Sequence, residues 1–307
     1  MKFKILGNAG IEVSAVGLGC NNFGRRIGEK ESREIVHEAL DAGVTFFDTA
    51  ESYGGGESEK YLGKALGRRR SDIVIATKFG WGGRHNQPNV EESIDNSLRR
   101  LGTDYVDLYQ IHKPDDLTPI SETLEALDSI VSAGKVRAIG CSNFNASQLS
   151  QAVNTSTANN ITGFCSVQNE YSLLRREAEQ EVVPVCREFS VGILPYYPLC
   201  GGLLTGKYKR GIAGGKENRL GDGGIGSSGW LTDANFDVVE KLSAFAEERG
   251  QKLLDLAISW LAIKPEVTSV IAGARRPGQV SANVKSAEWA LSADELRELE
   301  SVLNNIV

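Results

Sequence analysis

The chain has 307 residues, of which 41% are hydrophobic and 24% charged, and its formal net charge is −6 at pH 7. This composition is typical of a globular protein, and the acidic balance argues against nucleic acid or an anionic membrane as partner. No apolar signal core and no uninterrupted run of about 20 apolar residues occur, so we expect a cytoplasmic protein. The five scattered cysteines and three histidines predict neither a disulfide framework nor a metal site.

The predicted elements begin with a small hairpin, residues 2–5 and 11–13, around a Gly-Asn-Ala-Gly turn. After it, short apolar runs alternate with amphipathic segments. The predicted strands are 14–18, 44–48, 72–78, 105–112, 136–141, 163–168, 191–195 and 269–272. The predicted helices are 29–42, 57–66, 89–101, 120–133, 145–153, 178–189, 234–248, 253–263, 279–287 and 294–303.

Eight strands that alternate with helices predict a parallel sheet with right-handed crossovers. Repeats of roughly 30 residues fit an α/β fold of the (β/α)8 or TIM-barrel type, for which about 250 residues is typical. The hairpin precedes this barrel, and extra helices lie near the C-terminus. A doubly wound open sheet is the alternative. No Pro- or Ser-rich linker divides the chain, so residues 1–307 are predicted to form a single domain.

Polar or small residues stand at the C-terminal end of every predicted strand, where such barrels carry their active sites. A barrel would gather these residues around one mouth, whereas an open sheet would spread them along an edge. In chain order they are Gly19, Asp48, Lys78, His112, Ser142 with Asn143, Gln168 with Asn169, Tyr196, and Gly273 to Arg275.

The residue types at this mouth suggest acid–base chemistry. Asp48 and Lys78 end neighbouring strands and can form an ion pair, which would keep the partly desolvated lysine charged. A charged Lys78 would lower the pKa of Tyr53 from about 10, which makes this phenol a usable general acid. His112 can hydrogen-bond the same oxygen. Carbonyl reduction needs such a proton donor, because the carbonyl oxygen takes up a proton while a hydride is added to the carbonyl carbon.

Each of these residues also has a structural interpretation. A Lys–Asp pair can serve stability alone, and a lone tyrosine or histidine often only packs, but the four together favour catalysis. Phe23 and Trp81 are predicted either to form an apolar substrate wall or to serve packing. His37 and His85 are predicted to lie at the surface, with His85 also a candidate for the substrate rim.

Three glycine-rich stretches need separate interpretation. Residues 201–207 match G-x-x-x-x-G-K, but Tyr208 follows where a phosphate-binding loop needs Ser or Thr. The Gly-Leu-Gly run at 17–19 lacks the third glycine of the dinucleotide fingerprint, so no Rossmann domain is predicted. Segment 211–229 is interpreted as a lid or a plain surface loop, and its Arg219 could clamp a cofactor.

Over nearly its whole length, the chain resembles the aldo-keto reductase family. The matching stretches are 43–54 (GVTFFDTAESYG), 101–112 (LGTDYVDLYQIH), 139–144, 167–171, 196–208 and 270–275. The resemblance implies reduction of an aldehyde or ketone to an alcohol, with a catalytic tetrad of Asp48, Tyr53, Lys78 and His112. In it, Tyr53 donates the proton and His112 also contacts the substrate.

Two other functions stay open. The family includes subunits of potassium channels that use a bound cofactor for regulation, so one alternative is a regulatory subunit with little turnover. The other is a barrel lyase that forms a Schiff base through Lys78. The oligomeric state is not predicted.

The resemblance implies NADPH as cofactor, with NADH less favoured. Ser142, Asn143 and Gln168 would hold the nicotinamide carboxamide, and Tyr196 would stack on the ring. Arg275 suits the 2′-phosphate, because a guanidinium makes paired hydrogen bonds to phosphate. Asp48 would also touch the ribose, Leu199, Gly201 and Lys207 would line the pyrophosphate, and Gly273, Gln279 and Asn283 would bind the adenosine end. The other implied cofactor residues are Gly19, Cys20, Tyr197, Pro198 and Arg219.

Three positions depart from the family pattern. Ala282 stands where many relatives have a glutamate that contacts adenine, so this contact should be missing. Residues 20–22 (CNN) replace a stretch that often contains Thr, Met or Trp, and Tyr197 replaces a common Ser. Because residues 20–22 lie beside the expected substrate site, the particular substrate does not follow from the resemblance.

Overall fold

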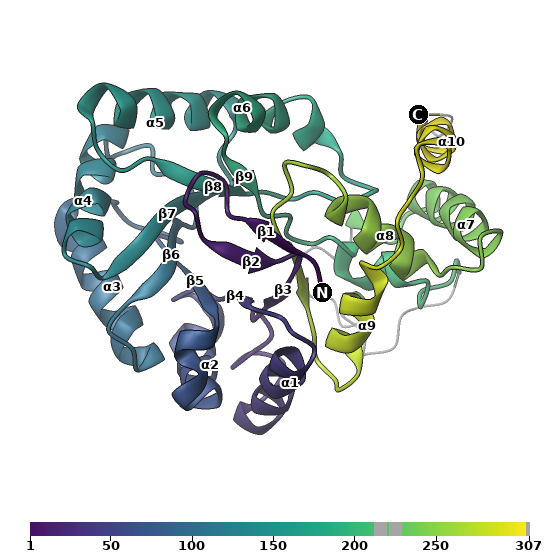
Figure 1. The fold of residues 1–307 in the computed structure, drawn as a ribbon, viewed down its shortest axis with the longest axis horizontal. Coiled ribbons are helices and arrows are strands. Elements are labelled where there is room, and N and C mark those ends of the chain that lie inside the picture. Colours follow the sequence, from purple (N-terminus) through teal and green to yellow (C-terminus); the bar gives the residue numbers. More distant parts are fainter. Residues whose placement is uncertain (212–219, 221–228, 305–307) are drawn as a thin grey trace.

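An eight-stranded parallel sheet forms the centre of the fold in the computed structural model, which describes residues 1–211, 220 and 229–304 (Figure 1). The strand order is β10-β3-β4-β5-β6-β7-β8-β9. Backbone hydrogen bonds join Ile193 in β9 to Glu266 and Thr268, and Ile271 in β10 to Pro195. The two edges of the sheet therefore meet. The predicted (β/α)8 barrel is confirmed, and the open-sheet alternative is wrong.

Strands and helices alternate along the chain as predicted. The strands are β1 (Phe3–Ile5), β2 (Glu12–Ser14), β3 (Val16–Gly19), β4 (Phe46–Asp48), β5 (Val74–Phe79), β6 (Val106–Ile111), β7 (Val136–Ser142), β8 (Phe164–Gln168), β9 (Gly192–Ile193) and β10 (Val270–Gly273). The helices are α1 (Glu29–Asp41), α2 (Glu57–Leu66), α3 (Gln87–Leu101), α4 (Ile120–Ser132), α5 (Ala146–Asn159), α6 (Val182–Phe189), α7 (Asp233–Glu247), α8 (Leu253–Ala262), α9 (Gln279–Ser286) and α10 (Ala293–Asn304). In Figure 1, α7 and α10 lie side by side away from the ring, as extra helices.

The predicted hairpin is confirmed, and it covers one end of the barrel. β1 and β2 pair antiparallel and lie across the middle of the ring in Figure 1. The hairpin contributes Leu6, Ile11 and Val13 to an apolar cluster at the amino ends of the strands. The barrel residues of this cluster are Phe46, Val74, Ala76, Leu108, Ala138, Cys165, Leu194 and Ile271. This end of the barrel is therefore a packed core.

Two helices differ from their predicted bounds by more than two residues. α5 continues six residues beyond the predicted end at residue 153, because its Ser- and Thr-rich last turns bury Ser156 and bond it to the Val153 carbonyl. The predicted helix 178–189 is interrupted, with a 3₁₀ turn at Glu177–Glu179 and α6 starting only at Val182. Pro184 explains the break, since proline fits only the first turn of a helix.

Within the described ranges, no helix combines the length and apolar character that crossing a membrane requires. In the same residues, no group of three or more His, Cys, Asp or Glu side chains is placed to hold a metal ion. All five cysteines are buried, and none forms a disulfide.

Candidate active site

Asp48 and Lys78 meet inside the barrel at the carboxyl ends of β4 and β5. Side chains alternate along a strand, so Phe46 and Val74 enter the apolar cluster while Asp48 and Lys78 form the next polar layer. Lys78 Nζ donates to the two Asp48 carboxylate oxygens at 2.8 and 2.6 Å and to the Thr49 carbonyl at 2.9 Å. The side chains are 0% and 3% exposed, so this ion pair is shielded from solvent.

The electrostatics of the pair follow from its burial. Desolvation lowers the pKa of Lys78, and the adjacent Asp48 carboxylate opposes that shift. The three nearest oxygen acceptors around Nζ match the three N–H donors of an ammonium group, and the Tyr53 hydroxyl oxygen is a fourth, more distant acceptor at 3.4 Å. The surroundings of Lys78 are therefore those that a charged lysine needs in a buried site.

Tyr53 lies next to this pair, in the 3₁₀ turn Tyr53–Gly56 that follows β4. Lys78 Nζ donates to its hydroxyl oxygen at 3.4 Å. The turn depends on Gly54, whose φ is +59°, since a Cβ there would lie 2.9 Å from the carbonyl oxygen of Phe23. Glycine thus allows the turn to pack against the loop after β3 and holds the half-buried phenol over Lys78.

His112 completes the predicted tetrad from the end of β6. Its backbone N–H donates to the Phe79 carbonyl at 2.7 Å, which fixes the residue beside β5. Its ring meets the Tyr53 ring edge-on, with 5.7 Å between centroids, and its Nδ1 lies 3.4 Å from Ser52 Oγ. The structure therefore brings all four predicted residues into one cluster at the barrel mouth.

The His112 imidazole is neutral at physiological pH. Burial, together with the positive charges of Lys78 and Lys113, lowers the pKa of His112 to about 2. A neutral imidazole can donate one hydrogen bond but does not act as a competing acid. Among the described mouth residues, Tyr53 is therefore better suited than His112 to give up a proton.

Two glutamines hold the other side of Asp48. Gln168 Nε2 donates to Asp48 Oδ1 at 2.9 Å, and Gln110 Nε2 donates to the same oxygen at 3.3 Å. Gln168 Nε2 also lies 3.3 Å from Gln110 Oε1. Gln168 is among the predicted site residues, whereas Gln110 is not. The signal was available, because Gln110 precedes His112 by two residues on the strand and so faces the barrel interior.

Residues expected around the nicotinamide form a second network beside the pair. Asn143, with φ of +62°, accepts a hydrogen bond from Tyr196 Oη at 2.8 Å and donates to Ser142 Oγ at 3.1 Å. Ser142 Oγ donates to the Gln168 carbonyl at 2.8 Å. Burial raises the pKa of Tyr196, so its hydroxyl stays protonated. The ends of β7, β8 and β9 thus present linked amide and hydroxyl groups to the mouth.

The segment after β9 turns tightly around glycines. Tyr197 and Cys200 have positive φ, followed by Gly201 at +66° and Gly202 at +98°. The positive φ of Gly202 favours glycine, and the absence of a side chain there leaves room for the end of Lys207, since a Cβ would lie 2.7 Å from its Nζ. A glycine turn with a lysine across it is suited to a phosphate-bearing group.

The residues expected at the adenosine end gather at the start of α9. Gln279 Oε1 accepts the backbone N–H groups of Arg275 and Arg276 at 2.7 and 3.0 Å. Asn283 is buried one helical turn later. Glu38 of α1 accepts the N–H of Gly278, which ties α9 to α1. The loop between β10 and α9 is therefore held in a defined shape.

The remaining predicted site residues differ in their exposure. The side chains of Phe23 and Cys20 are fully buried in the core, so the packing interpretation holds for Phe23. Arg219 lies outside the described residues. Trp81 is 54% exposed, and its ring lies 4.5 Å from that of His112. Of the two aromatic candidates, Trp81 is the exposed one and Phe23 the buried one.

The prediction of a surface position is wrong for His85. The ring is buried, at 5.3 Å and edge-on to Phe79, and it lies against Gly80, where a Cβ would come within 2.3 Å of Nε2. Asp115 accepts the His85 backbone N–H and helps to hold the loop over the ring. His37 is exposed, as predicted.

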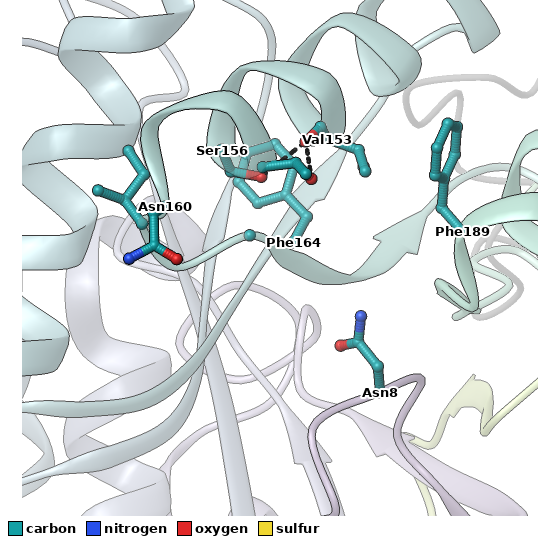
Figure 2. Close-up of a pocket in the computed structure, with 9 residues that line it drawn as sticks. Asn8, Val153, Ser156, Asn160, Phe164 and Phe189 are labelled. Carbon is teal, nitrogen blue, oxygen red and sulfur yellow. Dashed lines mark hydrogen bonds between the residues drawn. The ribbon is translucent and has the colours of Figure 1, made fainter.

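A separate pocket of about 280 Å³ lies at the opposite end of the barrel. Figure 2 shows it between Asn8 of the hairpin turn, the last turns of α5, and Phe189 at the end of α6. The nine described residues that line it include no ionisable side chain. This pocket therefore offers no group for proton transfer, and the candidate active site is the mouth around Tyr53.

A parallel barrel whose mouth joins a buried Asp–Lys pair to a tyrosine and a neutral histidine has the groups that carbonyl reduction requires. The chain belongs to the aldo/keto reductase family, whose model matches residues 15–304. It is 34% identical to "Aldo-keto reductase YhdN" of Bacillus subtilis (strain 168), over 100% of this chain and 95% of that protein.

Two further relatives show how widely this family is used. The chain is 34% identical to a "Probable voltage-gated potassium channel subunit beta" of Oryza sativa subsp. japonica, over 99% of this chain and 97% of that protein. It is 32% identical to "L-glyceraldehyde 3-phosphate reductase" of Escherichia coli (strain K12), over 98% of this chain and 92% of that protein. Family membership supports an oxidoreductase that acts on carbonyl groups of a small molecule with a nicotinamide cofactor.

Proposed function

We propose that the protein reduces an aldehyde or ketone to the corresponding alcohol, with Tyr53 as proton donor and NADPH as cofactor. The observation that carries this proposal is the position of Lys78 Nζ, which Asp48 holds through both oxygens and which reaches the Tyr53 hydroxyl at 3.4 Å. When bound, NADPH would supply the hydride that the carbonyl carbon receives.

The residues at the mouth fit this cofactor. Gln168 Nε2 already donates to Asp48. The Gln168 Oε1 atom would therefore accept a hydrogen bond from the NH₂ group of the nicotinamide carboxamide, beside Ser142 and Asn143. The glycine turn under Lys207 suits a pyrophosphate. The remaining proposed contacts are the ring of Tyr196 on the nicotinamide and Arg275 at the 2′-phosphate. Arg275 is the reason for preferring NADPH over NADH.

The protein's own residues would handle the proton and the developing charge. Tyr53 gives its proton to the carbonyl oxygen, and the Lys78 ammonium stabilises the phenolate that remains. Asp48 keeps Lys78 oriented and does not exchange the proton itself. His112 is neutral, so it can donate a hydrogen bond that orients the carbonyl and polarises it.

Replacing Tyr53 with phenylalanine tests this assignment. Tyr53→Phe removes only the hydroxyl, so kcat should fall by about 10²–10⁴ because the general acid is lost. The dissociation constant for NADPH, measured by quenching of tryptophan fluorescence, should not change. Turnover of a carbonyl panel at the wild-type rate, followed by loss of NADPH absorbance, would show that Tyr53 is not the proton donor.

The geometry favours neither of the two alternatives. A Schiff base needs an accessible, uncharged amine, whereas Lys78 is fully buried with three oxygen acceptors around Nζ. The Tyr53–Lys78–Asp48 contacts needed for proton donation are all present, which supports turnover over a purely regulatory role.

A further inference from the structure

Trp81 and Lys113 lie next to each other at the barrel mouth, beside the proposed proton donor Tyr53. The Trp81 ring lies 4.5 Å from the His112 ring, and Lys113 Nζ lies 4.0 Å from the Trp81 centroid. Both Trp81 and Lys113 are exposed. Two short contacts therefore connect the Lys113 ammonium to the histidine that faces Tyr53 at the mouth.

In the part of the chain that the structure describes, Lys113 has no acidic partner. Among the residues that the structure describes, no carboxylate lies within 4.0 Å of Lys113 Nζ in an ion pair. The nearby Asp115 is occupied, since its oxygens accept from the backbone N–H groups of His85 and Leu117 and from the Thr118 hydroxyl. A positive charge thus remains at the mouth of a protein whose net charge is −6.

The indole gives this cation a defined position. An ammonium over an aromatic face is attracted by the ring quadrupole, so Trp81 limits where the flexible Lys113 side chain can go. The rest of the ammonium can still bind an anion as a point charge. Its charge also acts on the mouth itself, since Lys113 contributes to the lowered pKa of His112.

We propose that Trp81 and Lys113 select carbonyl substrates that carry a carboxylate or a phosphate. The indole would cover the carbon skeleton, and the ammonium would bind the anionic group. This inference rests on the proposed function and deepens it, because it names the class of substrate that the mouth prefers.

Matched substrate pairs test the proposal. The wild-type protein should reduce 4-carboxybenzaldehyde with a kcat/KM about tenfold above that for 4-methylbenzaldehyde, and glyceraldehyde 3-phosphate above glyceraldehyde. Whichever pair differs more identifies carboxylate or phosphate as the preferred anion. The preference should shrink as salt is raised from about 0.01 M to 0.5 M, because ions screen exposed charges.

Substitution of the lysine isolates its contribution. Lys113→Met should lower the ratio of kcat/KM for the anionic aldehydes to that for their neutral counterparts by about tenfold. Lys241→Met on α7 is the matched control, since it removes one exposed lysine charge outside the mouth. Equal wild-type turnover of neutral and anionic aldehydes would overturn the proposal, as would a preference that persists in Lys113→Met.

A binding measurement separates failure of this proposal from failure of the proposed function. If no aldehyde is reduced, the reductase assignment is wrong, but the anion site can still be tested by calorimetry with benzoate and benzamide. Benzoate should bind the wild type more tightly than benzamide, and this difference should vanish in Lys113→Met. Equal benzoate affinity in both proteins would overturn the anion site whatever the turnover shows.

Discussion

The two ends of the barrel are built from the same strands but have opposite character. At the amino end, Phe46 of β4, Val74 of β5 and Leu108 of β6 pack against the N-terminal hairpin. At the carboxyl end, the same strands contribute Asp48, Lys78 and Gln110, and the last two both donate hydrogen bonds to the Asp48 carboxylate.

This contrast separates stability from chemistry within single strands. The apolar layer stabilises the fold by burying hydrophobic surface, and an unpaired polar atom within it would be destabilising. It requires no charged groups in fixed orientations. The polar layer is stabilised less, since desolvation of an ion pair offsets much of its attraction. The polar layer instead positions the Lys78 ammonium next to the phenol of Tyr53, where its charge can stabilise a phenolate. Changes at the two ends should therefore have different consequences.

The largest effect is expected at the polar end. Lys78→Met should lower kcat by about 10²–10⁴, because Tyr53 loses the charge that stabilises its phenolate. It should also reduce the free energy of unfolding by about 3–5 kcal/mol, since Asp48 is left as a buried, unpaired carboxylate. Steady-state kinetics and urea titration measure the two effects.

A double variant provides the control for this experiment. Lys78→Met with Asp48→Leu replaces both charges with apolar groups, so stability should return while activity stays lost. A double variant with wild-type activity would show that the pair has no part in catalysis.

The second prediction concerns the apolar end. Leu108→Ala removes a fully buried side chain from the cluster and should lower the free energy of unfolding by about 2–5 kcal/mol. Because the change lies one layer below the site, kcat should be unchanged at temperatures where the variant is folded. Thermal denaturation and kinetics at 20 °C below the melting temperature check this, and a large fall in kcat would contradict the separation of the two ends.

The smallest effect concerns the pH dependence of stability. His112 has a folded-state pKa of about 2, against about 6.5 when unfolded, so between these values the unfolded state binds one more proton. Stability should therefore fall as pH drops below about 6.5, by up to about 1.4 kcal/mol per unit. In His112→Asn this slope should be smaller, as measured by urea titrations from pH 7 to 5. Identical slopes would mean that His112 is not held neutral.

Much of the fold could be predicted because each strand–helix repeat leaves a local signal. The β-branched and aromatic runs, and the glycines and prolines that end them, indicated all eight barrel strands and the hairpin. The signal failed where local preference was ambiguous. The Ser- and Thr-rich end of α5 has weak helix propensity and is stabilised by burial, while Pro184 delays α6 in a segment that otherwise looks helical.

The site was predictable only in part. Asp48, Tyr53, Lys78 and His112 stand out as polar residues at strand ends, and the structure brings them together. Gln110 was missed although it stands two residues before His112, a spacing that places both side chains on the same face of the strand. His85 was wrongly predicted to lie at the surface, because a histidine in a glycine-rich loop gives no sign that the loop folds back over its ring.

By itself the sequence determined the order of strands and helices, and which residue types occur at each strand end. These follow from local periodicity and turn chemistry, which act over a few residues. Only the tertiary structure decided which of these side chains share an environment. Closure of the sheet brings Gln168 of β8 to Asp48 of β4. Packing around the mouth lowers the pKa of His112 and leaves Lys113 without an acidic partner among the described residues. Such effects depend on distance and burial between residues far apart in the chain, which no local pattern encodes.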